Sequence, residues 1–193
     1  MAWDLKVNSN GYGGSMKRIL FAALLCTFLT VSAHAEKIKE NDSFPEFKLS
    51  GLQDKKGVDL NSLRKKHKVI LVDFWASWCE PCKLSMPILN KLEKKYRSKG
   101  LVVIGINVDD SRESGIGFAK ENPVDFRLVF DEGKKIIDKV GVATMPSSFL
   151  IDNKGKVRLV HKGFREGDDK TYENHINTLL GGGKPAAAKG KKK

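Results

Sequence analysis

Two stretches in the middle of the chain are almost entirely hydrophobic, which is typical of strands buried on both faces of a sheet. They are Val69–Trp75 and Leu101–Val108. Between them, from Leu84 to Tyr96, hydrophobic residues recur at helical spacing, and Pro87 is expected to kink this helix. A strand, a helix and a strand in this order predict a right-handed βαβ unit with parallel strands.

The residues just before this unit predict a smaller element. Hydrophobic residues alternate with polar ones on both sides of a charged turn between residues 47 and 60, so we expect an N-terminal β-hairpin there. Either Asn61 or Ser62 should then cap a short helical turn that ends at Lys66.

The second half of the chain shows shorter patterns. Asp152–Gly155 is a strong turn signal between two β-branched runs, so these runs should form antiparallel strands. The expected elements are a helix over Arg112–Asn122, a strand over Phe126–Phe130, a helix over Lys134–Val140, strands over Ser147–Ile151 and Lys156–Lys162, and a closing helix over Asp168–Leu180.

The start of the chain has the features of a secretory signal peptide. Two basic residues follow Met16, an apolar run extends from Ile19 to Val31, and small residues lead up to Ala35. The apolar run is too short for a membrane span of about 20 residues. We therefore expect a signal peptide over residues 16–35 that is cleaved after Ala35, an exported or periplasmic protein, and a start assigned too far upstream over residues 1–15.

The net charge of +12 does not indicate a nucleic-acid partner. Residues 184–193 carry +5, and the predicted domain over residues 36–180 has a mixed surface without a basic stripe interleaved with aromatics. Residues 181–193 form a Lys-rich, low-complexity tail, which we expect to be disordered. We expect a monomer that does not bind nucleic acid.

Two acids, Asp109 and Asp110, follow the second buried strand. Ligands often bind at this edge of an open parallel sheet, but the chain lacks the glycines that would cradle a phosphate there. We therefore expect these acids to cap a loop.

Cysteine usage points to redox chemistry. Of three cysteines, Cys26 leaves with the signal peptide, so the mature chain keeps Cys79 and Cys82. A disulfide that closes so small a loop adds little stability, and exported thiols oxidise, so the pair is better explained as a redox switch than as a structural link. Zinc would require four ligands; His67, His161 and His175 show no ligand spacing and are expected at the surface, so we expect no metal.

The predicted position of the two cysteines gives each a role. Cys79 falls at the N-terminus of the helix, where free backbone N–H groups and the helix dipole favour a thiolate, so it should be the nucleophile. Cys82 lies one turn further into the helix and should resolve the mixed disulfide. Glu80 and Lys83 act on the Cys79 thiolate with opposite charge, and Pro81 fixes the backbone between the sulfurs.

Three motifs resemble the thioredoxin superfamily, specifically the exported branch of cytochrome c maturation and related thiol reductases. Trp78–Lys83 resembles the redox motif, Asp73 matches a buried acid, and Thr144–Pro146 with the following Ser147–Asp152 matches the cis-proline loop and its strand. The resemblance extends from about Asp42 to Leu180. It implies a thioredoxin-like α/β fold: a central mixed β-sheet flanked by helices, here with an N-terminal hairpin and an inserted helix.

The resemblance also implies roles for single residues. Pro146 would be cis and face the sulfurs, the Met145 backbone would pair with an extended substrate segment, and Trp78 would help to dock the substrate while Trp75 packs beneath the site. Asp73, if buried, should have a raised pKa and could relay the proton of Cys82. The alternative for Asp73 is a mid-strand acid that serves packing only.

The functional expectation is dithiol–disulfide exchange outside the cytoplasm. We favour net reduction of protein disulfides, for example in apocytochromes, with a membrane thiol reductase as electron donor and no cofactor beyond the cysteine pair. Two departures bear on the substrate: Ser85 stands where many members have glutamate, and several have a neutral residue in place of Asp73. The alternatives are a peroxidase, which would need an activating threonine before its cysteine, and a non-catalytic binding module.

Overall fold

A computed structural model describes residues 38–54 and 56–181 of the 193-residue chain. The expected signal peptide, the residues before it and the tail from residue 182 onward lie outside the described residues. Within the described part of the chain, no helix is both long enough and apolar enough to cross a membrane.

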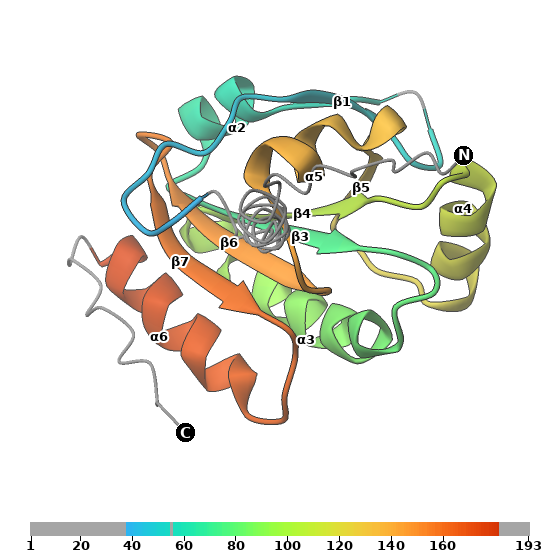
Figure 1. Cartoon of the computed structure of the whole chain (residues 1–193). Helices are drawn as coiled ribbons and strands as arrows, with labels where there is room; N and C mark the ends of the chain where they lie inside the picture. The colour runs from blue at the N-terminus through green and yellow to red at the C-terminus, as the bar shows by residue number, and fades with distance from the viewer. Residues whose placement is uncertain (1–37, 55, 182–193) are drawn as a thin grey trace, which may run out of the picture. The chain divides into compact units, whose positions relative to one another are not determined.

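Seven strands form one mixed sheet in the order β2-β1-β5-β4-β3-β6-β7, with helices on both sides (Figure 1). The strands are β1 (Lys48–Gly51), β2 (Val58–Asp59), β3 (Val69–Trp75), β4 (Leu101–Asn107), β5 (Arg127–Phe130), β6 (Ser147–Asp152) and β7 (Val157–Lys162). The α-helices are α2 (Leu60–Lys66), α3 (Glu80–Tyr96), α4 (Arg112–Glu121), α5 (Lys135–Val140) and α6 (Asp168–Leu180), with 3₁₀ turns at Arg97–Lys99 and Glu132–Lys134.

The βαβ unit predicted from the two hydrophobic runs is confirmed. β3 and β4 are parallel neighbours, and all seven residues of β3 are buried because other strands cover both of its edges and helices cover both of its faces. α3 connects them and continues through Pro87 as one helix. Gly100 then reverses the chain with a φ of 112°, a conformation that favours glycine.

Alternation along β3 assigns its side chains to two different layers. Figure 1 shows α3 and α6 on one side of the central strands and α2 and α5 on the other. Phe74 packs edge-on against Phe149 of β6, with ring centroids 5.9 Å apart. Asp73 and Trp75 point to the opposite face, and Asp73 therefore lies on the side of α3 and α6.

The N-terminal hairpin is confirmed, but the expected cap of α2 was wrong. β1 pairs with β2 in antiparallel register, and α2 follows directly. Its N-cap is Asp59, whose carboxylate accepts a hydrogen bond from the Ser62 amide at 3.0 Å, in place of Asn61 or Ser62. Asp59 ends a strand in the extended conformation that an N-cap requires, so its side chain reaches the third amide of the helix.

The C-terminal half follows the sequence prediction closely, with one correction. β6 and β7 are antiparallel around the predicted turn, and α6 has the predicted bounds. His161, however, is not a simple surface residue. Its Nε2 lies 2.8 Å from Asp168, only 15% of its side chain is exposed, and its ring packs on Tyr172 with centroids 5.0 Å apart.

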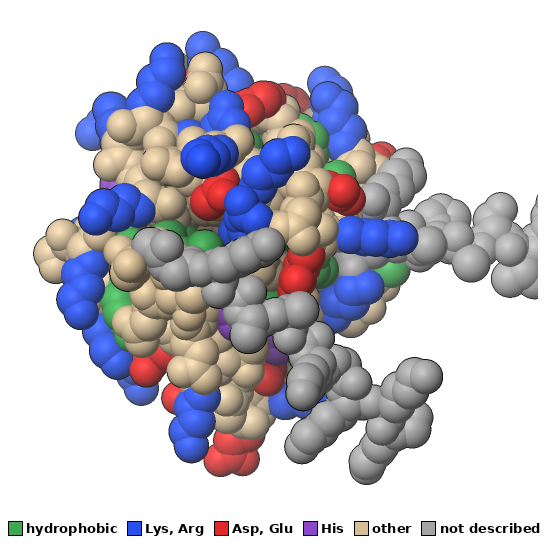
Figure 2. Space-filling model, turned by 90° about the vertical axis from the view of Figure 1, so that its left-hand side faces the viewer, with side chains coloured by type: hydrophobic (Ala, Val, Ile, Leu, Met, Phe, Trp, Pro, Cys, Tyr) green, Lys and Arg blue, Asp and Glu red, His purple; other side chains and the backbone are tan. Residues whose placement is uncertain are grey.

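The surface of the domain carries charges of both signs. Figure 2 shows Lys and Arg side chains spread over the face of the molecule that carries α6 and β7, with Asp and Glu side chains among them. The exposed ion pairs Lys95–Glu173 and Lys94–Asp125 fit this mixed pattern.

Candidate redox site

Cys79 and Cys82 form a disulfide at the start of α3, with an S–S distance of 2.04 Å. Cys79 is the N-cap of this helix, and its Sγ accepts a hydrogen bond from the Cys82 amide at 3.3 Å. Cys82 is fully buried, whereas Cys79 keeps 4% exposure. The helix start thus offers an N–H donor and a positive dipole end to the sulfur that is nearer the solvent, as the sequence predicted.

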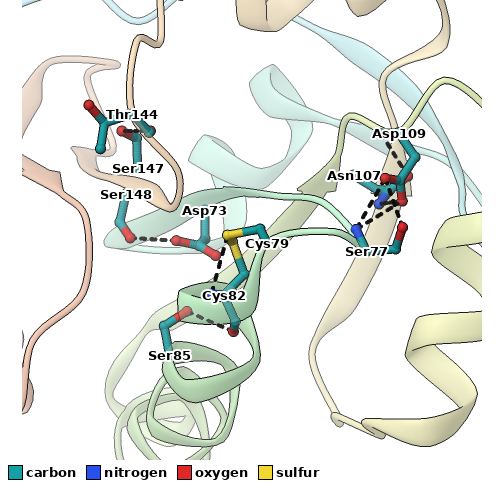
Figure 3. The surroundings of a disulfide bond; sticks show 10 residues. All are labelled: Asp73, Ser77, Cys79, Cys82, Ser85, Asn107, Asp109, Thr144, Ser147 and Ser148. Carbon is teal, nitrogen blue, oxygen red and sulfur yellow. Dashed lines mark hydrogen bonds between the residues drawn. A yellow bond between two sulfur atoms is a disulfide. The ribbon is translucent and has the colours of Figure 1, made fainter.

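The loop before Cys79 is held by a buried carboxylate at the end of β4. The Ser77 amide and hydroxyl both donate to Asp109 at 3.1 Å, and Asn107 Nδ2 donates to it at 2.8 Å (Figure 3). The parallel register that pairs Trp75 with Asn107 places these groups at the same edge of the sheet. The prediction that these two acids cap a loop is confirmed for Asp109, whereas Asp110 is exposed and pairs with Lys134.

Asp73 lies on the other side of the disulfide. It is 1% exposed, and the antiparallel register of β3 and β6 pairs it directly with Ser148. The Ser148 hydroxyl donates to Asp73 Oδ1 at 2.5 Å, and Oδ2 has no hydrogen-bond partner among the described residues. Figure 3 shows the carboxyl group between Ser148 and the two cysteines, with this second oxygen on the cysteine side.

Burial changes the acidity of this carboxyl group. Loss of solvation raises the pKa of Asp73 to about 7, and the hydrogen bond from Ser148 opposes that rise. A group with such a pKa can both accept and release a proton near neutral pH. Asp73 is therefore buried and has the raised pKa that a relay of the Cys82 proton would require.

Sequence reasoning did not identify the two residues behind Asp73. The Tyr172 hydroxyl, on α6, donates to Ser148 Oγ at 2.8 Å, so a chain of two hydrogen bonds reaches the carboxyl group. Tyr172 is 1% exposed, and burial raises its pKa above the ordinary value. Hydrophobic residues at helical spacing within α6 place Tyr172 on its apolar side, which assigns it no functional role. The register of β6 against β3 is the signal that would have paired Ser148 with Asp73.

The loop before β6 lies at the same end of the central strands as the disulfide. Ser147, the first residue of β6, pairs with Phe74 near the end of β3, so the preceding Thr144–Pro146 loop lies beside the start of α3. The Met145–Pro146 peptide bond is cis, and Pro146 is buried. Among the described residues, the backbone amide and carbonyl of Met145 have no hydrogen-bond partner.

The remaining predicted site residues divide into exposed and buried sets. Trp78 is 68% exposed, and Glu80 and Pro81 are exposed beside it. Trp75 is fully buried beneath the loop and packs on Phe118 of α4, with ring centroids 5.3 Å apart.

Ser85, the departure noted in the redox motif, turns away from the sulfurs. It is buried, and its hydroxyl donates to the Cys82 carbonyl at 3.0 Å. In the part of the chain that the structure describes, no group of three or more His, Cys, Asp or Glu residues is placed to hold a metal ion.

Comparisons with known proteins agree with this geometry. A model of the Redoxin family matches residues 39–176. The chain is 34% identical over 168 residues to a thiol-disulfide oxidoreductase ResA of Bacillus cereus, a match that covers 84% of this chain and 94% of the relative. It is also 34% identical over 146 residues to the ResA protein of Bacillus subtilis, covering 75% of this chain and 80% of that one.

Solved structures show the same fold. One, from Chlorobium tepidum and described as a proposed thiol:disulfide interchange protein DsbE, is 37% identical with a TM-score of 0.70, covering 75% of this chain and 99% of that one. The thioredoxin domain of a thiol-disulfide oxidoreductase from Bacteroides vulgatus is 25% identical with a TM-score of 0.62, covering 73% of this chain and all (100%) of that one. The expected thioredoxin-like fold is confirmed.

Proposed function

This chain belongs to the Redoxin family, as a thiol:disulfide oxidoreductase similar to ResA, and on that premise we propose that it reduces disulfides of exported proteins through Cys79 and Cys82. The observation that carries the proposal is the position of Cys79 as the N-cap of α3, where the Cys82 amide donates to its sulfur. In the reduced protein the same N–H group and the helix dipole stabilise the Cys79 thiolate, the species that attacks a disulfide.

The reaction proceeds in two exchanges. The Cys79 thiolate attacks one sulfur of the substrate disulfide, which forms a mixed disulfide and releases the other substrate sulfur as a thiolate. Cys82 then loses its proton and attacks Cys79 Sγ, which forms the Cys79–Cys82 disulfide and releases the second substrate thiolate. Two electrons pass to the substrate, and the oxidised pair corresponds to the disulfide in the structure.

Asp73 takes the proton in the second exchange. Cys82 is fully buried, so its thiol has no direct access to water, and Asp73 Oδ2 is an unpartnered acceptor among the described residues. With a pKa near neutrality, the Asp73 carboxylate accepts the Cys82 proton at low cost and later releases it.

The substrate binds beside the disulfide, at the end of the central strands. The unpaired Met145 backbone hydrogen-bonds to an extended substrate segment in the manner of an added strand, and Trp78 supplies an exposed apolar contact. The cis Pro146 borders this segment.

The proposals for location, electron donor and substrate rest on the sequence. The pattern of residues 16–35 supports export, and an exported reductase requires a source of electrons, for which we propose a membrane thiol reductase. Apocytochrome c thiols are the proposed substrate class, on the resemblance of the redox motif. We propose that the protein acts as a monomer.

Trapping of the mixed disulfide tests this function. In Cys82→Ser the second exchange is blocked, so we expect substrates to accumulate as mixed disulfides on Cys79, identifiable by mass spectrometry of the protein isolated from the exported fraction. The electron donor should be trapped through its oxidised form, whose disulfide the Cys79 thiolate attacks. Cys79→Ser/Cys82→Ser is the matched control and should trap nothing. Equal recovery of partners by both variants would favour a non-catalytic binding module. An equilibrium titration against glutathione would then fix the redox direction, since about 30 mV changes the equilibrium constant tenfold.

A further inference from the structure

A chain of two hydrogen bonds links α6, β6 and β3 behind the disulfide. Tyr172 Oη donates to Ser148 Oγ at 2.8 Å, and Ser148 Oγ donates to Asp73 Oδ1 at 2.5 Å. The three residues are each 2% exposed or less, so water does not compete for these bonds. The chain ends at the carboxyl group that Figure 3 places beside the cysteines.

When Asp73 is ionised, the state that can take a proton from Cys82, its carboxylate can only accept hydrogen bonds, and this fixes the direction of each bond. A serine hydroxyl has one proton and accepts through its lone pairs. The Tyr172 hydroxyl occupies an acceptor position on Ser148, so the single proton of Ser148 is directed at Asp73. Consecutive hydrogen bonds also polarise each other, which strengthens the donation to Asp73.

We propose that Tyr172 and Ser148 are positioning residues for the second exchange: they hold Asp73 Oδ1 and thereby keep Oδ2 free and turned toward Cys82. This inference rests on the proposed function, because it concerns the proton that Cys82 releases. In that step the Cys82 S–H bond breaks, the proton binds Asp73 Oδ2, and the new thiolate forms the S–S bond with Cys79 as the substrate thiolate leaves. Ser148 and Tyr172 keep their own protons throughout.

The hydrogen-bond chain through Ser148 and Tyr172 is the main polar environment of the Asp73 carboxyl group. Ser148 faces it from β6 and the cysteine pair faces it from the start of α3, while Tyr172 of α6 is bonded to Ser148. Burial raises the pKa of Tyr172, and the charges of Asp73 and Asp168 raise it further. Asp168 is itself paired with His161 of β7. Because Ser148 donates to the charged form of Asp73, weakening its bond should make the carboxyl group harder to ionise.

Removal of the Tyr172 hydroxyl tests the proposal. In Tyr172→Phe we expect the Asp73 pKa, followed by carbon-13 NMR of labelled aspartate, to rise by about 0.5–1 unit. The acid limb of the resolution rate, measured by stopped-flow decay of a preformed mixed disulfide, should shift upward by the same amount, with a rate at pH 7 about two- to fivefold lower. Ser148→Ala should give a larger shift in the same direction, and it keeps the test open if Tyr172→Phe does not fold.

Tyr96→Phe is the matched control. Tyr96 is as buried as Tyr172 but lies at the far end of α3, so its loss should leave both the Asp73 pKa and the pH profile unchanged. In an Asp73→Asn background, Tyr172→Phe should no longer shift the profile, because positioning acts only through Asp73.

The outcomes separate this inference from the proposed function. An unchanged Asp73 pKa in both Tyr172→Phe and Ser148→Ala, or a shift of equal size in Tyr96→Phe, would overturn the positioning role. A persistent shift of the profile in the Asp73→Asn background would overturn it as well. Failure of the cysteine pair to exchange any disulfide, with the NMR shift intact, would instead remove the proposed function while the positioning of Asp73 stood.

Discussion

Two buried carboxyl groups flank the disulfide, and they differ in how many donors they receive. Asp109 is 3% exposed and accepts bonds from the Ser77 amide, the Ser77 hydroxyl and the Asn107 amide group. Asp73 is 1% exposed and accepts one bond, from Ser148. One carboxylate is compensated for its burial, and the other is left with an oxygen that has no partner among the described residues.

The difference separates a structural acid from a reactive one. Hydrogen bonds from several donors offset the loss of hydration of a buried carboxylate, so Asp109 can anchor the loop before Cys79. A single donor does not fully offset the lost hydration of a buried carboxylate, so its pKa rises toward neutral pH, as it does for Asp73. The sheet thus provides rigid geometry on one side of the sulfurs and a proton acceptor on the other.

The largest expected effect is on the pH dependence of stability. The folded-state pKa of Asp73 is about 7 against 3.8 for the free group, so between these values the folded protein binds more protons than the unfolded chain, and stability falls as pH rises. Asp73→Asn removes this cost. At pH 8 we expect the variant to be more stable than the wild type by on the order of 2–4 kcal/mol, with no difference near pH 3.

Urea unfolding of the oxidised protein across pH 3–9 measures this difference. Asp109→Asn serves as the comparison and should show no such stabilisation. Parallel stability curves for wild type and Asp73→Asn would contradict the assignment of Asp73 as an uncompensated acid.

The second prediction concerns the exchange rate. Asp73→Asn leaves a side chain of similar shape that cannot accept the Cys82 proton, so resolution of a mixed disulfide at pH 7 should slow by about 10- to 100-fold. The first exchange, attack by the Cys79 thiolate, should change little. Stopped-flow kinetics of the two phases checks this, and equal slowing of both phases would indicate a general distortion of the site.

The third prediction concerns the anchoring of the loop before Cys79 by Asp109. Asp109→Asn presents an NH₂ group where the carboxylate received the Ser77 and Asn107 donors, and we expect it to destabilise the fold by about 2 kcal/mol. Asp110→Asn is the matched control: its side chain is 93% exposed and pairs with Lys134, so its loss should cost less than about 0.5 kcal/mol. Thermal unfolding decides between them, and similar losses would mean that burial of Asp109 has no special role.

Local signals in the sequence predicted the strands and the loop cap on the Asp109 side of the disulfide. The hydrophobic runs predicted β3 and β4 because strands buried on both faces have continuous hydrophobic sequences. The end of such a strand is where an acid such as Asp109 caps a loop. Cys79 was placed at a helix start by the same local reasoning.

The reactive side depends on contacts between distant parts of the chain. Ser148 pairs with Asp73 only through the register of two strands 75 residues apart, and Tyr172 reaches Ser148 from a third element. A single sequence records hydrophobic periodicity but not register, so these partners escaped prediction. The His161–Asp168 pair spans only seven residues, but it forms because the chain turns back between β7 and α6, and hydrophobic periodicity does not record that geometry.

The smallest expected effect is that of removing the Ser85 hydroxyl. Ser85 is 1% exposed and lies within one turn of Cys82, yet its hydroxyl donates to the Cys82 carbonyl, within its own helix, and does not reach the sulfur. In Ser85→Ala the loss of this bond is partly offset by the better helix propensity of alanine, so stability should change by less than about 1 kcal/mol. The pH profile of resolution should stay at the wild-type position, because Ser85 forms no hydrogen bond with Asp73 or Ser148. A displaced pH profile in this variant would show that a buried side chain near the sulfurs can change the pH dependence of resolution without a hydrogen bond to Asp73. The number of hydrogen-bond donors would then no longer explain the difference between Asp73 and Asp109.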